Sequence, residues 1–293
     1  MTDPYSPLFL AASSGDLETI QELSSDASQE DLNKALAEAA ALNHFEAADA
    51  LIMAGADADG DYDPLFGTVL FPACEFMNPE GIAWLIERGA DPAREVIRTD
   101  GPRNALEHLF HSHHRSPLKS RCIQLLLQAG APDPEDAQMA IHLGSLPRLK
   151  KVLDARPELL NEPLEISYGW FPLAGASLLH MAVEFNQGDL VEELLERGIH
   201  VNQIAEAIPG TSTTTPVWPT DLVTLGRQSP IFHAKGDSKD MLKLLLKHGA
   251  GPSAEALFLR DGKEVSLTPL EFFEEIDNIE CNLLEEVLTL KTL

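Results

Sequence analysis

The chain has 293 residues, of which 44% are hydrophobic and 23% are charged, a composition typical of a soluble globular protein with a sizeable core. Its 47 acidic and 21 basic residues give a formal net charge of −26, which repels phosphate backbones and anionic membranes and argues against nucleic acid or a membrane as partner. No run of about 18 apolar residues occurs, and no basic region precedes the first apolar residues, so we expect a cytoplasmic protein.

Short amphipathic helix patterns recur along the chain in pairs, each pair separated by a polar break. Most pairs end with a Gly just past the second helix. A helix often ends there with a left-handed backbone conformation, which only glycine adopts without steric strain. Gly55 and Gly89, which close two successive pairs, lie 34 residues apart. We expect pairs over residues 4–27, 31–58, 64–92, 102–132, 134–160, 174–202 and 228–252, followed by a last pair without a closing Gly over 266–290.

The residue types in these pairs predict how they pack. Small residues in the first helices, such as Ala39, Ala40 and Ala182, allow neighbouring pairs to approach closely, and Leu and Ile in the second helices fill the space behind. One pair is too small to close a core, so successive pairs must stack in a row.

The chain resembles the ankyrin-repeat family. The segments SPLFLAA (6–12), SLLHMAV (177–183) and TPLEFF (268–273) match the first half of the family pattern, and WLIERGAD (84–91) and ELLERGI (193–199) match the second half. The spacing of 34 residues also agrees with the ankyrin period of about 33. The resemblance implies an all-α solenoid of about seven degenerate repeats plus a C-terminal cap.

We predict one domain over 1–293, with N-terminal repeats in 4–101, irregular middle repeats in 102–202, and C-terminal repeats with the cap in 203–293. The sequence departs from the family pattern at an insertion, HSHHRS (111–116), and at the linkers 157–176 and 199–228, which are much longer than a simple finger turn. Long insertions of this kind are usually functional or disordered.

The stretch DADGDYD (57–63) places aspartates on alternate positions between two helix pairs. A calcium loop starting at Asp57 needs Gly at its sixth position and Glu at its twelfth. This chain has Tyr62 and Thr68 there, so we interpret the stretch as a finger that turns at Gly60. The residues of this finger expected to contact a partner are Asp57, Asp59, Asp61, Tyr62 and Asp63.

A histidine cluster offers the main alternative chemistry. His108 and His111 are one helical turn apart, His113 and His114 follow, and three imidazoles could bind zinc with an open position for catalysis. The only neighbouring acidic residue is Glu107, so we expect an exposed loop without a metal or cofactor. A metal-dependent enzyme around His108–His114 stays an alternative.

The three cysteines, Cys74, Cys122 and Cys281, are far apart in the sequence, which indicates buried free thiols rather than disulfides.

Two long linkers carry aromatic side chains, a residue type that often anchors protein interfaces. Further candidates for partner contact are therefore Tyr168, Trp170, Phe171 and Trp218. The motifs G-x-S-x-G, the P-loop and the Rossmann fingerprint are all missing from the sequence. We therefore expect a non-enzymatic, monomeric module that binds a protein with a basic patch, for example an immunity or inhibitor protein of a toxin. An effector that binds a host protein is the alternative.

Overall fold

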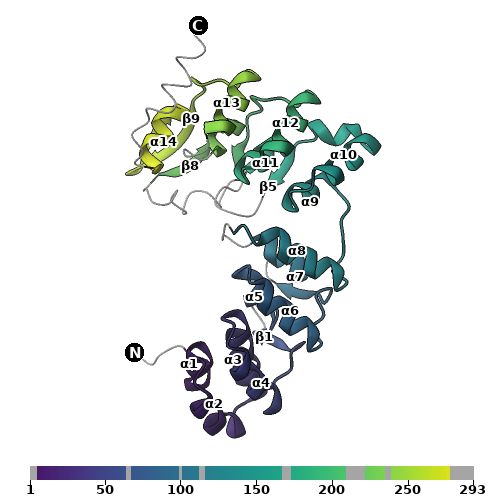
Figure 1. Ribbon diagram of the computed structural model, residues 1–293. Coiled ribbons are helices and arrows are strands. Elements are labelled where there is room, and N and C mark those ends of the chain that lie inside the picture. The colour runs from purple at the N-terminus through teal and green to yellow at the C-terminus, as the bar shows by residue number, and fades with distance from the viewer. Residues whose placement is uncertain are drawn as a thin grey trace. The chain divides into compact units, whose positions relative to one another are not determined.

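The computed structural model describes residues 5–63, 67–98, 101–111, 116–166, 173–208, 222–234 and 239–277, and its chain divides into two compact units, Met1–Pro134 and Glu135–Leu293 (Figure 1). The division falls at Pro132 and Pro134, in a stretch without helix or strand. Proline cannot donate a backbone hydrogen bond and restricts the residue before it, so no helix continues through this stretch. The assignment of 1–293 to one ankyrin domain stays a prediction.

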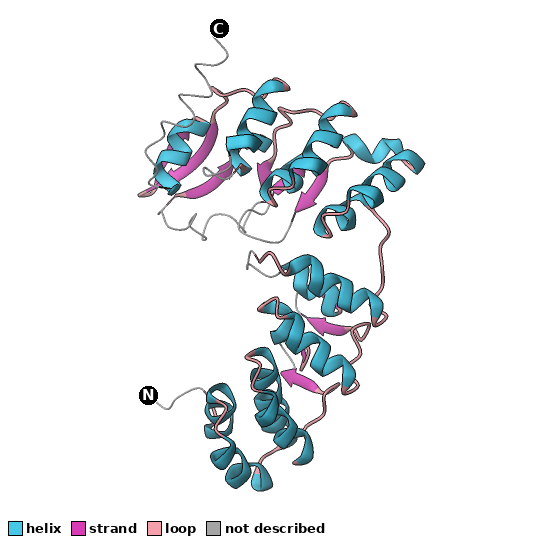
Figure 2. Cartoon of the chain, viewed as in Figure 1, coloured by secondary structure: helices cyan, strands magenta, loops and turns pink. Residues whose placement is uncertain are grey.

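The first unit consists of helix pairs that pack in sequence (Figure 2). Each first helix contacts the next first helix along the chain, from α1 to α3, α5 and α7, and α2 contacts α4 as α6 contacts α8. The pairs are α1 (Pro7–Ser14) with α2 (Leu17–Leu23), α3 (Gln29–Ala41) with α4 (Phe45–Met53), α5 (Phe71–Glu75) with α6 (Pro79–Glu87), and α7 (Ala105–His111) with α8 (Lys119–Gln128).

Small residues set the spacing between neighbouring pairs in this unit. Helix α3 buries Ala35, Ala39 and Ala40 completely. Gly81 on α6 lies so close to α3 that a Cβ atom at its position would be 2.5 Å from the carbonyl oxygen of Ala40. The backbones of successive pairs therefore touch directly, as the alanine-rich sequence predicted.

Two β-hairpins lie at the junctions between the helix pairs of the first unit. Strands β1 (Asp61–Asp63) and β2 (Gly67–Thr68) form the first hairpin, and β3 (Val96–Arg98) and β4 (Gly101–Arg103) form the second. The finger predicted for DADGDYD is therefore an antiparallel hairpin, with Asp61 paired to Thr68 and Asp63 to Gly67.

The second unit repeats the helical arrangement with one exception. Its first helices α9, α11 and the 3-10 helix η3 pack in turn, as do the second helices α10, α12 and α13. The short η3 stands where the sequence predicted an ordinary first helix. The elements are α9 (Ala137–His142), α10 (Leu146–Ala155), η2 (Pro157–Asn161), α11 (Leu178–Glu184), α12 (Gly188–Glu196), η3 (Pro230–His233), α13 (Lys239–Lys247) and α14 (Pro269–Asp277).

The fingers of the second unit pair side by side instead of standing as separate hairpins. One antiparallel sheet has the strand order β5–β6–β7 and the other has the order β10–β9–β8, and a bridge between Ala205 and Gln228 joins β7 to β8. The strands are β5 (Leu164–Ile166), β6 (Leu173–Ala176), β7 (Glu206–Ala207), β8 (Val223–Gly226), β9 (Ala256–Arg260) and β10 (Lys263–Leu267). The ends of both long linkers thus form strands, which the all-α prediction did not include.

Strand β9 also contributes to the hydrophobic core. Phe258 is fully buried, and its ring stacks on Phe272 of α14 with a centroid separation of 4.8 Å. Phe232 of η3 completes this aromatic group, at 6.5 Å from Phe258 and 5.7 Å from Phe272. The finger sheet and the last helix therefore share one core with η3.

Candidate functional site

A buried asparagine on α3 holds the backbone of the DADGDYD finger by hydrogen bonds. Asn33 is 4% exposed, and its amide oxygen accepts hydrogen bonds from the Asp57 backbone N–H and the Gln29 side chain, both at 2.9 Å. Its amide nitrogen donates to the Asp61 carbonyl oxygen at 3.1 Å. One side chain thus holds both ends of the turn, which fixes the direction in which the aspartates project.

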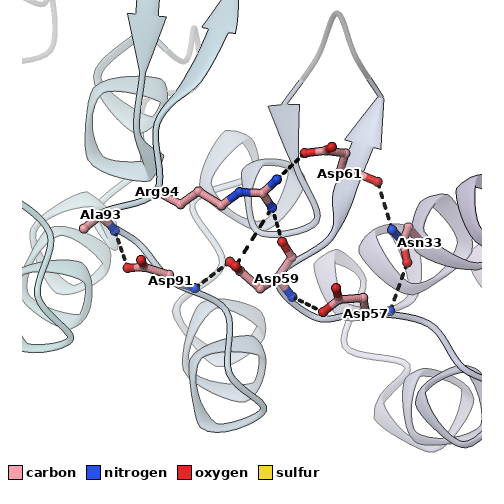
Figure 3. A network of polar contacts seen from close by, with 7 residues as sticks. All are labelled: Asn33, Asp57, Asp59, Asp61, Asp91, Ala93 and Arg94. Carbon is pink, nitrogen blue, oxygen red and sulfur yellow. Dashed lines mark hydrogen bonds and ion pairs between the residues drawn. The ribbon is translucent and has the colours of Figure 1, made fainter.

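An arginine from the following finger joins the same network. Figure 3 shows the Arg94 side chain extended toward Asp59 and Asp61. Its guanidinium donates to the Asp59 carbonyl oxygen and, at 2.6 Å, to the Asp61 carboxylate. The Asp59 carboxylate in turn accepts from the Asp91 backbone N–H at 2.9 Å. Two successive fingers are therefore connected by charged and polar groups.

The network borders a groove of about 490 Å³. Four carboxylates and one guanidinium line it, and the side chains of Asp61 and Asp59 keep 63% and 39% of their surface exposed. Such a groove suits a cationic side chain, since carboxylates bind Arg and Lys by charge-assisted hydrogen bonds. The lining residues are Gln29, Glu30, Asn33, Asp57, Asp59, Gly60, Asp61 and Arg94.

Replacing Asn33 with alanine should loosen the finger without unfolding the helices. The change leaves the Asp57 N–H and the Asp61 carbonyl without their partner, and we expect a loss of about 1–3 kcal/mol in the free energy of unfolding. Hydrogen exchange should show faster exchange at Asp57 while α3 stays protected. Equal loss of protection in α3 and the finger would contradict the role assigned to Asn33.

The sequence singled out the finger aspartates but neither Asn33 nor Arg94. A signal for Asn33 exists, because it precedes Leu36, Ala37 and Ala40 at helical spacing and is therefore a polar residue within an apolar stripe. Arg94 has no such local signal, since its partner Asp61 lies one repeat earlier in the chain.

The remaining predicted contact residues are placed only in part. Tyr62 is half-buried on β1, and Asp63 is described by its backbone alone. Tyr168, Trp170, Phe171 and Trp218 lie outside the described residues.

The structure places one histidine of the cluster in a packing role. His108 stacks on Phe71 of α5 at 4.4 Å, and its Nε2 atom lies 3.2 Å from the Glu75 carboxylate. His111 lies in α7, where only its backbone is described. His113 and His114 lie outside the described residues. Within the described ranges, no group of three or more His, Cys, Asp or Glu side chains is arranged to hold a metal ion.

The two cysteines that the structure describes are free and buried, as predicted. Burial raises the pKa of the Cys74 thiol well above its ordinary value, and burial also raises the pKa of the Cys122 thiol to about 12. Both thiols therefore stay protonated at neutral pH and are poor nucleophiles. Cys281 lies outside the described residues.

No helix in the part of the chain that the structure describes has both the length and the apolar character needed to cross a bilayer.

Comparison with known proteins agrees with the helix-pair architecture. A family model of ankyrin repeats in three copies matches residues 8–96, and a single-repeat ankyrin model matches 174–203. No curated protein matches the sequence. The matches leave 97–173 and 204–293 uncovered, so the count of seven repeats and the C-terminal cap stay predictions.

Two solved structures illustrate the similarity. The human ASB11 ankyrin repeat domain is 20% identical with a TM-score of 0.41, and the alignment covers 97% of each chain. The ankyrin repeat domain of Bcl-3, a member of the IkappaB protein family, is 20% identical with a TM-score of 0.33, and the alignment covers 98% of this chain and 99% of that one. Ankyrin repeats are in general protein–protein interaction modules. From the family matches, the helix pairs and the finger hairpins, the chain is an ankyrin-repeat protein.

Proposed function

We propose that the chain is a non-enzymatic binding module that holds a protein partner by a basic patch, with the groove beside the DADGDYD finger as the contact site in the first unit. The observation that carries the proposal is the groove itself, which Glu30, Asp57, Asp59 and Asp61 line together with Arg94, and where Lys34 pairs with Glu30 at 2.7 Å. The general role of ankyrin repeats in protein–protein interaction supports the same conclusion.

The fixed position of the finger favours binding. Asn33 and Arg94 hold the backbone of the turn before any partner arrives, so less conformational freedom is lost on association. The net charge of −26 attracts a basic protein from a distance, which raises the association rate at low salt. Long-range attraction and local contact therefore select the same class of partner.

A specific form of the proposal is a monomeric, cytoplasmic immunity or inhibitor protein that covers the basic active site of a toxin. The acidity of the chain supports this form. In this proposal Tyr168, Trp170, Phe171 and Trp218 of the second unit would add apolar contacts with the partner. Binding of a host protein by an exported effector would use the same surface and is the second candidate.

Reversal of one charge in the groove tests the proposal. Asp61→Lys removes a groove carboxylate and repels Arg94, so we expect affinity for a basic twelve-residue peptide of charge +6 to fall about tenfold. Asp240→Lys on α13 is the matched control, because the Asp240 side chain is 99% exposed and the net charge changes equally. Fluorescence anisotropy at low and physiological salt measures both variants, and circular dichroism confirms that each is folded.

The difference between the two variants separates local contact from overall charge. If both variants weaken binding equally, the peptide responds only to net charge and the groove is not the site. If neither weakens it, the groove is not the contact site either.

A further inference from the structure

A second inference concerns the interface between α11 and η3 in the second unit and does not depend on the groove. Helix α11 packs directly against η3. Polar side chains are buried on both elements. They are Ser177, the N-cap of α11, His180 on α11, and Gln228, Ser229 and His233 on or just before η3, each with 6% exposure or less. Buried polar groups are costly unless they are paired, so their hydrogen bonds determine how this interface holds together.

The hydrogen bonds of His180 require a neutral imidazole. Its Nδ1 atom accepts from the Ser177 backbone N–H at 3.0 Å and lies 2.9 Å from the Ser177 hydroxyl. Because a backbone N–H can only donate, Nδ1 must carry the lone pair and Nε2 must carry the hydrogen. Nε2 then donates to the Gln228 carbonyl oxygen at 3.2 Å, which ties the start of α11 to the segment leading into η3.

The same carbonyl also belongs to the contact between fingers. The Gln228 oxygen accepts from the Ala205 backbone N–H at 2.8 Å, and the Gln228 N–H donates back to Ala205 at 2.9 Å. His180 therefore supports both the helix contact and the bridge that joins β7 to β8.

Other titratable groups face this interface from the packed elements. His233 on η3 has its ring 5.5 Å from that of His180, and its Nδ1 lies 3.2 Å from the Glu184 carboxylate of α11. His142 on α9, 3% exposed, lies beside Phe185 just past the end of α11. Helix α12 also packs on α11, but the side chains that it buries are apolar, namely Leu190, Val191, Leu194 and Leu195.

A proton on His180 would meet unfavourable surroundings. A proton on Nδ1 would point at the Ser177 backbone N–H, which would lose its acceptor. The Ser177 hydroxyl can rotate to accept the new hydrogen, but the backbone N–H cannot. The positive charge would lie in a buried position beside a second imidazole. Glu184 bonds to His233, whereas the hydrogen-bond partners of His180, Ser177 and Gln228, carry no negative charge.

We propose that His180 is an acid-sensitive contact that holds η3 and α13 against α11 and α12 at neutral pH and releases them as the solution becomes acidic. Burial, and next the neighbouring His233, lower the pKa of His180 from 6.5 to about 3. A group whose pKa is lowered by folding stabilises the folded state fully above its unfolded value. This stability is lost as the pH falls from 6.5 toward 3, and the opening equilibrium rises about tenfold per pH unit.

Hydrogen–deuterium exchange on the full chain at pH 7.5 and pH 5.0 tests the proposal, with rates corrected for the intrinsic effect of pH. We expect protection of α13 to fall about 30-fold between the two conditions, the factor that follows from 1.5 pH units below the unfolded pKa. Helix α3 of the first unit is the internal control and should change far less. Unchanged protection of α13 in the native chain would overturn the proposal without any variant.

A conservative variant separates the titration of His180 from its packing. In His180→Gln the side-chain oxygen can accept from Ser177 and the amide nitrogen can donate toward Gln228, but the group carries no charge at any pH. We expect this variant to remain folded at pH 7.5 and to lose most of the 30-fold change in α13. His200→Gln, at an exposed position of the same unit, should keep the native pH response. An acid response that persists in His180→Gln would belong to another group and would refute the role of His180.

Discussion

Replacing Phe258 with alanine should lower the free energy of unfolding of the second unit by about 3–5 kcal/mol, the usual cost of removing a buried aromatic ring. Phe258 is fully buried, stacks on Phe272 and lies beside Phe232. These three side chains come from β9, α14 and η3, so little of the resulting cavity can be filled by a shift of one element. The loss should therefore be near the upper end of this range.

Chemical denaturation followed by hydrogen exchange of each unit measures the effect. Leu259→Ala, the next residue on the same strand, is the matched control, because Leu259 is only half-buried and should lose about 1 kcal/mol. Protection in the first unit should stay unchanged in both variants. If Leu259→Ala destabilised the second unit as much as Phe258→Ala, the side of β9 that carries Phe258 would not be the side packed in the core.

Alanine at two helical glycines should have opposite effects. Gly81→Ala on α6 should destabilise the first unit by about 1–3 kcal/mol, because the new Cβ would be 2.5 Å from the Ala40 carbonyl oxygen and α6 would have to move away from α3. Gly188→Ala on α12 meets no atom within 4 Å and should stabilise the second unit by up to about 1 kcal/mol through lower backbone entropy in the unfolded chain.

Thermal unfolding of the two variants and the native chain decides between these outcomes. The test depends on whether each substitution raises or lowers the unfolding temperature relative to the native chain. If both glycines were ordinary helical glycines, alanine would stabilise the protein at both positions. Stabilisation by Gly81→Ala would show that α3 and α6 are further apart than described.

The helix pairs could be predicted from the sequence because their signals are local. The pairs expected over 31–58 and 174–202 correspond to α3 with α4 and α11 with α12. Gly89 and Gly198, expected as left-handed caps, have φ angles of 104° and 86°. Apolar periodicity and helix caps both depend on residues within one or two turns, so a single sequence is sufficient to find them.

The finger sheet and the groove network depend on contacts between distant residues. β9 lies 30 or more residues beyond its partner β8, and its register could not be inferred from the short apolar run ALFLR. Asn33 and Arg94 acquire their roles from a finger that belongs to a neighbouring repeat. The sequence therefore identified the acidic finger but not the residues that hold it in place.

The lateral pairing of strands in the second unit affects how this protein can change by duplication or deletion. In a solenoid with separate hairpins, one helix pair can be removed and the chain rejoined, since each hairpin belongs to its own repeat. Here β6 pairs with β7 and β8 pairs with β9, across repeat boundaries. Removing the α11–α12 pair would also disrupt the pairing of β6 with β7. We therefore expect the protein to tolerate exchange of repeats better in the first unit than in the second.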